Sequence, residues 1–135
     1  MNYIVIFLAL LLIVLLVYKL WAPTFKAPKR KVSENEARLY FFYTEWCGFS
    51  QKAMPEWKKL EDTLNSTPIF GTTRVKPVRV NAEEDPKTTE LYEVEGYPTI
   101  LLETRDGIYD YTGNRSHESL LQFLRKSLGK ESASL

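Results

Sequence analysis

The sequence predicts an α/β domain in which helices flank a mixed central sheet, preceded by one apolar helix. Three observations lead to this prediction. Residues 3–18 form an uninterrupted apolar run. Further along, segments with the apolar periodicity of strands alternate with segments in which apolar residues recur every three or four positions, as in helices. Two short strand-like segments then follow each other across a tight turn, which adds an antiparallel hairpin to a parallel pair.

The N-terminal segment, residues 1–22, has the composition of a membrane anchor. Its run Tyr3–Tyr18 contains no charged side chain, and about 20 apolar residues in a helix span the core of a bilayer. The alternative is a cleaved signal peptide, but no basic residue precedes the run and residues 20–23 make a poor cleavage site. We therefore expect a single-pass transmembrane helix.

Residues 23–37 are predicted to form a basic juxtamembrane linker. They contain two prolines and little apolar periodicity, which is typical of a solvated spacer. Five basic residues and no acidic residue lie between positions 19 and 31. Because cytoplasmic flanks of membrane helices are enriched in Lys and Arg, this charge favours a cytosolic domain.

The domain assigned to residues 38–129 carries mixed charge and a single cysteine, Cys47. Residues 32–135 hold 13 basic and 17 acidic side chains, a net charge of −4, which argues against nucleic acid as a partner. One cysteine cannot form an intrachain disulfide, and with one histidine it supplies too few ligands for a metal site. The tail, residues 130–135, is predicted to be disordered.

The first strand and helix of the domain meet at Cys47. Residues 38–44 are an aromatic-rich run long enough for one buried strand. Residues 48–64 place apolar side chains at helical spacing, with lysines and acids between them, and Pro55 should kink this helix. A loop is expected over residues 65–71. The sequence thus predicts a strand, a tight junction and a long amphipathic helix.

The second strand is predicted within residues 74–81, where valines alternate with basic residues. Because Pro77 interrupts the alternation and cannot donate to a strand ladder, we expect the strand to begin near Val78. After it, the expected elements are a short helix begun by Asp85-Pro86, a strand, a turn, a partner strand and a last helix. We place these elements at residues 85–92, 98–103, 105–107, 108–112 and 118–128.

Cys47 stands where a strand passes into a helix, in the string Trp46-Cys47-Gly48-Phe49-Ser50. Unpaired N–H groups and a partial positive charge at a helix start stabilise a thiolate. Gly48 permits the tight turn, the Ser50 hydroxyl is in a position to donate to the sulfur, and Trp46 offers an apolar platform. A lone cysteine is more often buried and inert, but this location favours a reactive thiol.

These segments resemble those of thioredoxins and protein disulfide isomerases. Residues 43–48 (Tyr-Thr-Glu-Trp-Cys-Gly) look like the opening of the family's active site, and Pro55 matches its helix-kinking proline. Residues 96–99 (Gly-Tyr-Pro-Thr) resemble the loop that carries its cis-proline. Residues 111–115 are similar to a Tyr-x-Gly-x-Arg stretch of the isomerase branch. The resemblance implies a thioredoxin-like fold with the order β-α-β-α-β-β-α.

The resemblance also implies a groove for substrate. Pro98 would be cis, and with Gly96 and Tyr97 it would pair an extended peptide beside Cys47, which is recognition by strand addition. The partners implied are proteins that carry thiols or disulfides. The resemblance favours the lumenal side of a membrane, whereas the basic flank favours the cytosolic side, which is the side we expect.

Two departures from the family pattern narrow the chemistry. Ser50 stands where the family has its second cysteine, and Phe41 stands where it keeps a buried acid that serves that cysteine. Cys47 can therefore attack a disulfide and form a mixed disulfide, but another thiol must release it. We expect thiol–disulfide exchange or isomerase-type activity, not a self-contained dithiol oxidoreductase. No resident cofactor is expected; glutathione is a candidate for the external thiol.

Two alternatives remain open from the sequence. Cys47-Gly48-Phe49-Ser50 also resembles the motif of monothiol glutaredoxins, which bind glutathione and an iron–sulfur cluster. Those proteins are expected to have a lysine shortly before the motif and a Gly-Gly pair after the cis-proline, and this chain has neither. The third possibility is a redox-inactive module that binds peptides or retains clients through the groove alone. The oligomeric state is not predicted by any of these patterns.

Overall fold

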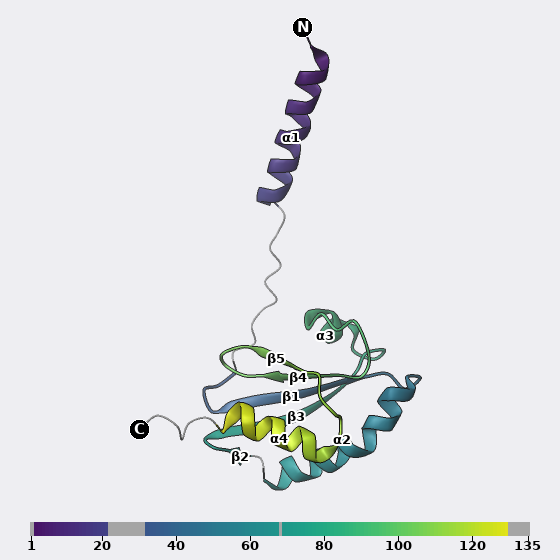
Figure 1. The fold of residues 1–135 in the computed structure, drawn as a ribbon, viewed down its shortest axis with the longest axis vertical. Coiled ribbons are helices and arrows are strands. Elements are labelled where there is room, and N and C mark those ends of the chain that lie inside the picture. Colours follow the sequence, from purple (N-terminus) through teal and green to yellow (C-terminus); the bar gives the residue numbers. More distant parts are fainter. Residues whose placement is uncertain (1, 22–31, 68, 130–135) are drawn as a thin grey trace.

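A computed structural model describes residues 2–21, 32–67 and 69–129. The predicted tail at 130–135 and most of the predicted linker lie outside these residues. The described part has four helices and five strands in the order shown in Figure 1. They are α1 (Tyr3–Trp21), β1 (Glu36–Tyr43), α2 (Gly48–Ser66), β2 (Ile69–Phe70), β3 (Thr73–Asn81), α3 (Pro86–Leu91), β4 (Thr99–Glu103), β5 (Ile108–Tyr111) and α4 (His117–Leu128).

The strands form one mixed sheet in the order β2-β3-β1-β4-β5. β1 lies at its centre, parallel to β3 and antiparallel to β4. The β4–β5 hairpin is antiparallel and closes one side. This arrangement confirms the predicted mixed sheet, with its parallel pair and its antiparallel hairpin. It also brings the end of β1 beside the start of β4. Cys47 lies shortly after β1, and Pro98 lies directly before β4.

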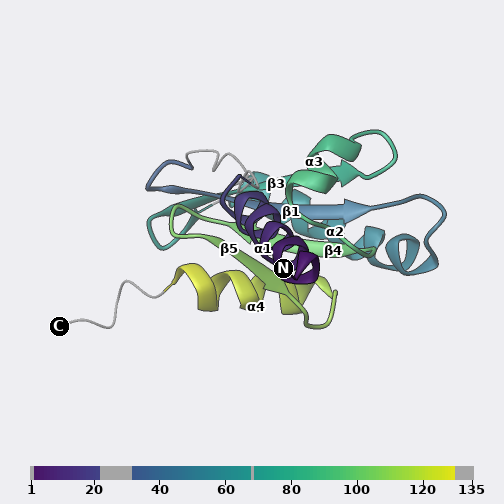
Figure 2. The same cartoon turned by 90° about the horizontal axis from the view of Figure 1, so that it is seen from above.

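Helices cover the two faces of the sheet unequally, as Figures 1 and 2 show. α2 and α4 pack on one face, where alternate residues of β1 such as Leu39 and Phe41 meet Trp57, Leu60 and Leu124. α3 lies over the other face, where Tyr40 and Phe42 meet Val80 and Leu101. Since successive residues of a strand point to opposite faces, the continuous aromatic run of β1 is buried on both sides.

A polar clasp joins α2 to the start of α4. The Glu56 carboxylate accepts a hydrogen bond from the backbone N–H of His117 at 2.9 Å. The His117 imidazole lies 2.9 Å from the Thr63 hydroxyl. Ser116 caps α4 by accepting from the Ser119 N–H at 3.3 Å. Hydrogen bonds to Lys59 and His117 lower the pKa of Glu56, despite an opposing contribution from burial. The clasp therefore fixes the position of α2 relative to α4.

The strands differ from the expected ones in three places. β3 begins at Thr73, not near Val78, because Pro77 lies in a stretch that pairs with β1 on one side, whereas β2 reaches only Thr73 and Arg74 on the other. A proline is tolerated in such an edge position. β1 begins at Glu36, two residues before the expected start. The short strand β2 lies inside the expected loop 65–71.

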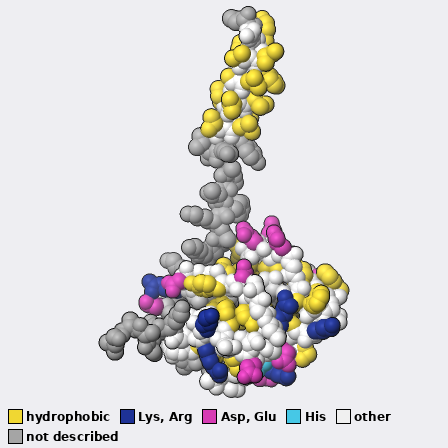
Figure 3. Space-filling view, in the orientation of Figure 1, with side chains coloured by type: hydrophobic (Ala, Val, Ile, Leu, Met, Phe, Trp, Pro, Cys, Tyr) yellow, Lys and Arg dark blue, Asp and Glu magenta, His cyan; other side chains and the backbone are white. Residues whose placement is uncertain are grey.

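α1 is a regular helix through the apolar run. Its side chains are exposed as far as the structure describes them, to Val17. Figure 3 shows apolar groups along its visible face, whereas the visible face of the domain mixes apolar, basic and acidic groups. Judged by length and apolarity, none of the described helices is able to cross a membrane. Met1 and Ala22, which the expected anchor includes, lie outside the described residues.

Candidate active site around Cys47

Cys47 occupies the N-cap position of α2, the residue that precedes the first helical turn. Its backbone is extended, with φ −79° and ψ 114°, and its carbonyl accepts from the Gln51 N–H at 3.0 Å. Its side chain makes no capping hydrogen bond and is partly exposed. The sulfur therefore stands at the mouth of the helix, where the first N–H groups have no partner within the helix.

Groups at the helix start lower the pKa of the Cys47 thiol. The largest effect comes from the Ser50 backbone N–H, and partial burial opposes it. The Ser50 hydroxyl, the Phe49 N–H and the positive charge of Arg115 lower the pKa further. All four stabilise the thiolate relative to the thiol. The predicted reactive thiol is thus supported by the atoms around it.

The loop before β4 faces the thiol. The Cys47 thiol donates to the Tyr97 carbonyl at 3.3 Å, and the Tyr97-Pro98 peptide bond is cis. The expected cis-proline is therefore confirmed. Gly96, the third residue of the predicted groove, accepts from the Thr99 hydroxyl at 2.7 Å. The structure thus brings all three predicted groove residues to the side of Cys47 on which β4 begins.

Two aromatic side chains flank the thiol and face solvent. Trp46 and Phe49 are each 68% exposed, and the Trp46 ring meets the Tyr97 ring edge-on at 6.4 Å between centroids. Exposed aromatic groups beside a reactive atom are common anchors for protein partners. Trp46 and Phe49 therefore offer apolar contacts, on either side of Cys47, to a peptide bound there.

The positions of the two departures are buried. Ser50 is 1% exposed and lies in the first turn of α2. Phe41 is fully buried and stacks on Trp57 with ring centroids 4.9 Å apart. The Trp57 indole in turn donates to the Glu61 carboxylate at 2.8 Å. Position 41 therefore carries an aromatic ring packed in the core, and this side chain has no group that could take a proton.

A second polar cluster lies under α3, and no motif in the sequence predicts it. The buried Glu103 carboxylate accepts from the Tyr40 hydroxyl at 3.2 Å and lies 3.6 Å from the Arg38 guanidinium. Tyr92 donates to Tyr40 at 2.9 Å, and burial raises the pKa of Tyr92. Every member of this cluster has a partner, so it is a satisfied structural network.

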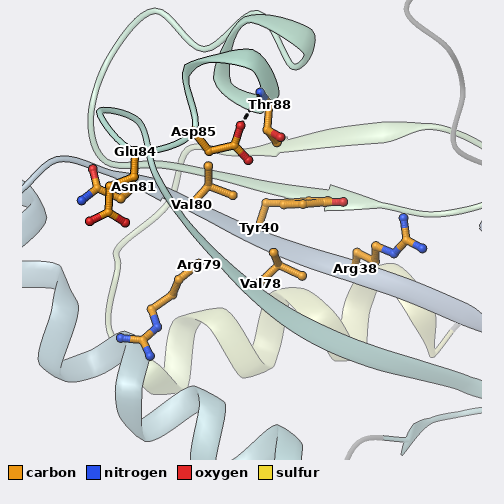
Figure 4. Close-up of a pocket in the computed structure, with 9 residues that line it drawn as sticks. All are labelled: Arg38, Tyr40, Val78, Arg79, Val80, Asn81, Glu84, Asp85 and Thr88. Atoms are coloured by element: carbon orange, nitrogen blue, oxygen red, sulfur yellow. Dashed lines mark hydrogen bonds between the residues drawn. The ribbon is translucent and has the colours of Figure 1, made fainter.

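A hollow of about 370 Å³ lies above this cluster, between the sheet and α3. Figure 4 shows Tyr40, Val78 and Val80 along its floor and Asp85 with Thr88 at its roof. None of the predicted site residues lines it. Asp85 caps α3 by accepting from the Thr88 N–H at 3.0 Å. The hollow is therefore separate from the thiol, on the α3 face of the sheet.

Comparison with known proteins identifies the family. The sequence profile of the family Thioredoxin matches residues 19–126, so the chain belongs to the thioredoxin family. It is 30% identical over 108 residues to a protein disulfide-isomerase of Datisca glomerata, covering 77% of this chain and 20% of that protein. It is 32% identical over 111 residues to protein disulfide isomerase-like 1-1 of Arabidopsis thaliana, covering 77% of this chain and 21% of that protein.

Among solved structures, the chain resembles human ERp44, with a TM-score of 0.59 and 25% sequence identity. That alignment covers 69% of this chain and 28% of the ERp44 chain. The chain spans about a fifth of the length of the two isomerases. These relationships identify a thioredoxin-like domain that is similar to one part of the longer isomerases.

Alkylation of Cys47 should reveal its lowered pKa. Because only the thiolate attacks an alkylating agent, the rate should rise as the thiol loses its proton and level off above the lowered pKa. We expect the half-maximal rate clearly below the ordinary cysteine value of about 8.5. Iodoacetamide labelling of the full chain between about pH 5 and about pH 10, read by mass spectrometry, measures it. A midpoint at or above the ordinary value would contradict the expectation.

Proposed function

We propose that this protein is a membrane-attached monothiol member of the family that captures client proteins as mixed disulfides. Cys47 attacks a disulfide of the client, or, when Cys47 is already in a disulfide with a small thiol, a client thiol attacks it and displaces the small thiol. A second molecule then releases the client, because Ser50 cannot do so. The activity is thiol–disulfide exchange or isomerase-type exchange, with the client or a small thiol completing the cycle.

One observation carries the proposal: a partly exposed thiol with a lowered pKa stands at a helix start, and a buried serine occupies the position of a second thiol. Cys47 is the only cysteine of the chain. The thiolate can therefore attack, but no second sulfur lies within reach to displace the client. The flanking aromatic side chains Trp46 and Phe49 support a peptide as the partner, since they offer apolar contacts on both sides of the sulfur.

The attachment to a membrane is the second part of the proposal, and it rests on the sequence of residues 1–22. The run from Tyr3 to Tyr18 is uncharged, and the described side chains of α1 are exposed. Both observations support the attachment, since a helix that is apolar all round is normally covered by lipid or protein. The basic residues after it favour a single pass with the domain in the cytosol. Likeness to isomerases is the argument for the lumenal side.

Capture of clients tests the exchange activity. The full chain is purified from its native membrane after free thiols have been blocked, and bound proteins are released by reductant and identified. We expect client proteins with the native chain and none with Cys47→Ala, because the covalent bond needs the sulfur. The matched control is Ser50→Ala, which keeps the thiol and should keep the clients. Clients that persist in Cys47→Ala would instead favour a redox-inactive binding module.

The same experiment separates the glutaredoxin alternative. Glutathione released together with iron and sulfide, in place of proteins, would overturn the proposed function.

Extraction of membranes tests the attachment. The full chain should stay with the membrane in alkaline carbonate, whereas a variant beginning at residue 23 should be washed off. Cysteine-reactive reagents that do not cross membranes report the side of the domain, since Cys47 is the only thiol. Labelling of sealed vesicles of known orientation distinguishes the cytosolic from the lumenal placement. Release of the full chain by carbonate would contradict the proposed attachment.

A further inference from the structure

A second hollow, the back pocket, lies beside the start of α2 and has a volume of about 570 Å³. Its polar lining residues include Thr44, Glu45, Ser50, Gln51, Lys58 and Arg79. Its size falls within the range of small-molecule sites. No sequence motif predicts it, because its lining comes from the end of β1, from α2 and from β3.

The back pocket has two buried hydroxyls: that of Thr44, which has no partner among the described residues, and that of Ser50, which acts only on the Cys47 sulfur. Thr44 is 2% exposed and Ser50 is 1% exposed, and both side chains line the hollow. The Ser50 hydroxyl is near enough to the Cys47 sulfur to lower its pKa. However, neither hydroxyl oxygen is within hydrogen-bonding distance and angle of a described residue. A buried hydroxyl without a partner is costly, so both oxygens suit a polar ligand in the hollow.

The back pocket offers one cation, Lys58, to a ligand that carries a carboxylate. Lys58 and Arg79 line it, against the single acid Glu45. Arg79 is held by Glu61 at 2.9 Å. Lys58 takes part in none of the ion pairs found among the described residues. The ammonium group of Lys58 can therefore form an ion pair with the carboxylate of a ligand in the hollow.

The place of the back pocket relative to Cys47 gives its role. In the sheet, β1 lies between β3 and β4. Arg79 of β3 lines the pocket, whereas the groove residues Tyr97 and Pro98 come directly before β4. The pocket adjoins Cys47 through Ser50, whose hydroxyl acts on the Cys47 sulfur, whereas the client groove adjoins it through the Tyr97 carbonyl. A thiolate that displaces one sulfur from another must approach along the line of the bond that breaks, from the side opposite the departing sulfur.

We propose that the back pocket binds the small thiol that releases clients from Cys47, and that it selects thiols bearing a carboxylate. This inference rests on the proposed function. The thiolate attacks the Cys47 sulfur, the bond to the client sulfur breaks, and the client leaves with the electron pair and takes a proton from water. A second small thiol then frees Cys47. Two small thiols are oxidised to one disulfide while the client sulfur is reduced.

The test measures release of a neutral fluorescent peptide joined to Cys47 of the full chain by a disulfide. Glutathione, which carries carboxylates, is compared with the uncharged β-mercaptoethanol at equal thiolate concentration. We expect the glutathione rate to saturate with concentration and to exceed the β-mercaptoethanol rate by about tenfold, the scale of one favourable ion pair at a partly buried site. Fluorescence anisotropy follows the release of the peptide.

The variants identify the pocket. Lys58→Glu should lower the glutathione rate by about tenfold and leave the β-mercaptoethanol rate within about twofold. Lys52→Glu is the matched control, since Lys52 is an exposed lysine of the same helix that does not line the pocket. Thr44→Val should raise the half-saturating glutathione concentration, with thermal unfolding as the check that the variant is folded.

Three results would overturn the inference. One is a glutathione rate that stays linear in concentration and equals that of the uncharged thiol. Another is an equal loss in Lys52→Glu and Lys58→Glu, which would reflect the general charge of the helix. Failure of Cys47 to form the peptide disulfide at all would overturn the proposed function together with the inference. The first two leave the proposed function standing.

Discussion

Replacing Ser50 by cysteine should make the mixed disulfide between Cys47 and its client short-lived. A thiol at this position lies in the first turn of α2, three residues after Cys47, where the Ser50 hydroxyl already influences the Cys47 sulfur. An attacking group held inside the molecule reacts as if it were extremely concentrated. We expect the lifetime of the Cys47–client disulfide to fall by about 10³-fold or more. The product would be a disulfide between Cys47 and the thiol introduced by Ser50→Cys.

The measurement is the decay of a preformed mixed disulfide on non-reducing gels, with Ser50→Ala as the matched control. Ser50→Ala removes the hydroxyl without adding a thiol, so its mixed disulfide should persist. In Ser50→Cys, the decay of the Cys47–client disulfide should also become faster as pH rises. The new thiol would be buried, since Ser50 is 1% exposed, and burial disfavours the charged thiolate, so the thiolate forms only at higher pH. A mixed disulfide that persists in Ser50→Cys would show that position 50 is not placed to attack.

Replacing Trp57 by alanine should have the largest effect on stability. Trp57 is 1% exposed, stacks on Phe41 and donates to Glu61. Truncating a buried Trp leaves a large cavity and costs about 3–5 kcal/mol, against a total of about 5–15 kcal/mol for a typical domain. We expect the full chain in detergent to lose much of its stability, as measured by thermal unfolding.

Trp57→Phe provides the matched control. It keeps an aromatic ring against Phe41 but removes the indole N–H, so the Glu61 carboxylate loses a partner. The expected cost is about 1–2 kcal/mol for the lost hydrogen bond and the smaller ring. Similar losses in the two variants would mean that the hydrogen bond, and not the stacked ring, carries the stability. That result would contradict the packing argument for Phe41.

Most of the fold was predictable from local patterns. The helix beginning at Gly48, the hairpin around Gly107 and the capped helix at Ser116 all combine regular periodicity with residues that favour their ends. The structure places α2 at Gly48–Ser66 and α4 at His117–Leu128, within two residues of the expected bounds. These elements form where local preference and tertiary packing agree.

The failures occurred where pairing partners decide the structure. Pro77 argues against a strand only if both edges of that strand are paired, and the sequence does not reveal which edge is open. The early start of β1 likewise depends on the pairing of Ala37 with Val75. Such long-range pairing leaves no local signature, so strand ends are less predictable than helix caps.

The candidate site divides in the same way. Cys47, Ser50 and Pro98 were recognisable because each lies in a short motif. The unpaired hydroxyl of Thr44 and the position of Lys58 carry no motif. Their meaning appears only when β1, α2 and β3 are placed side by side, and a signal for them would have required knowledge of the sheet order.

The open edge of β3 has a consequence for solubility. Beyond Arg74, none of the described residues pairs with the outer edge of this strand. An exposed strand edge invites a strand from another chain and can nucleate aggregates. Here the edge carries Pro77 between the exposed basic residues Lys76 and Arg79, which are common devices against such pairing. In the proposed function, such an edge would keep strands of a captured client from joining the sheet.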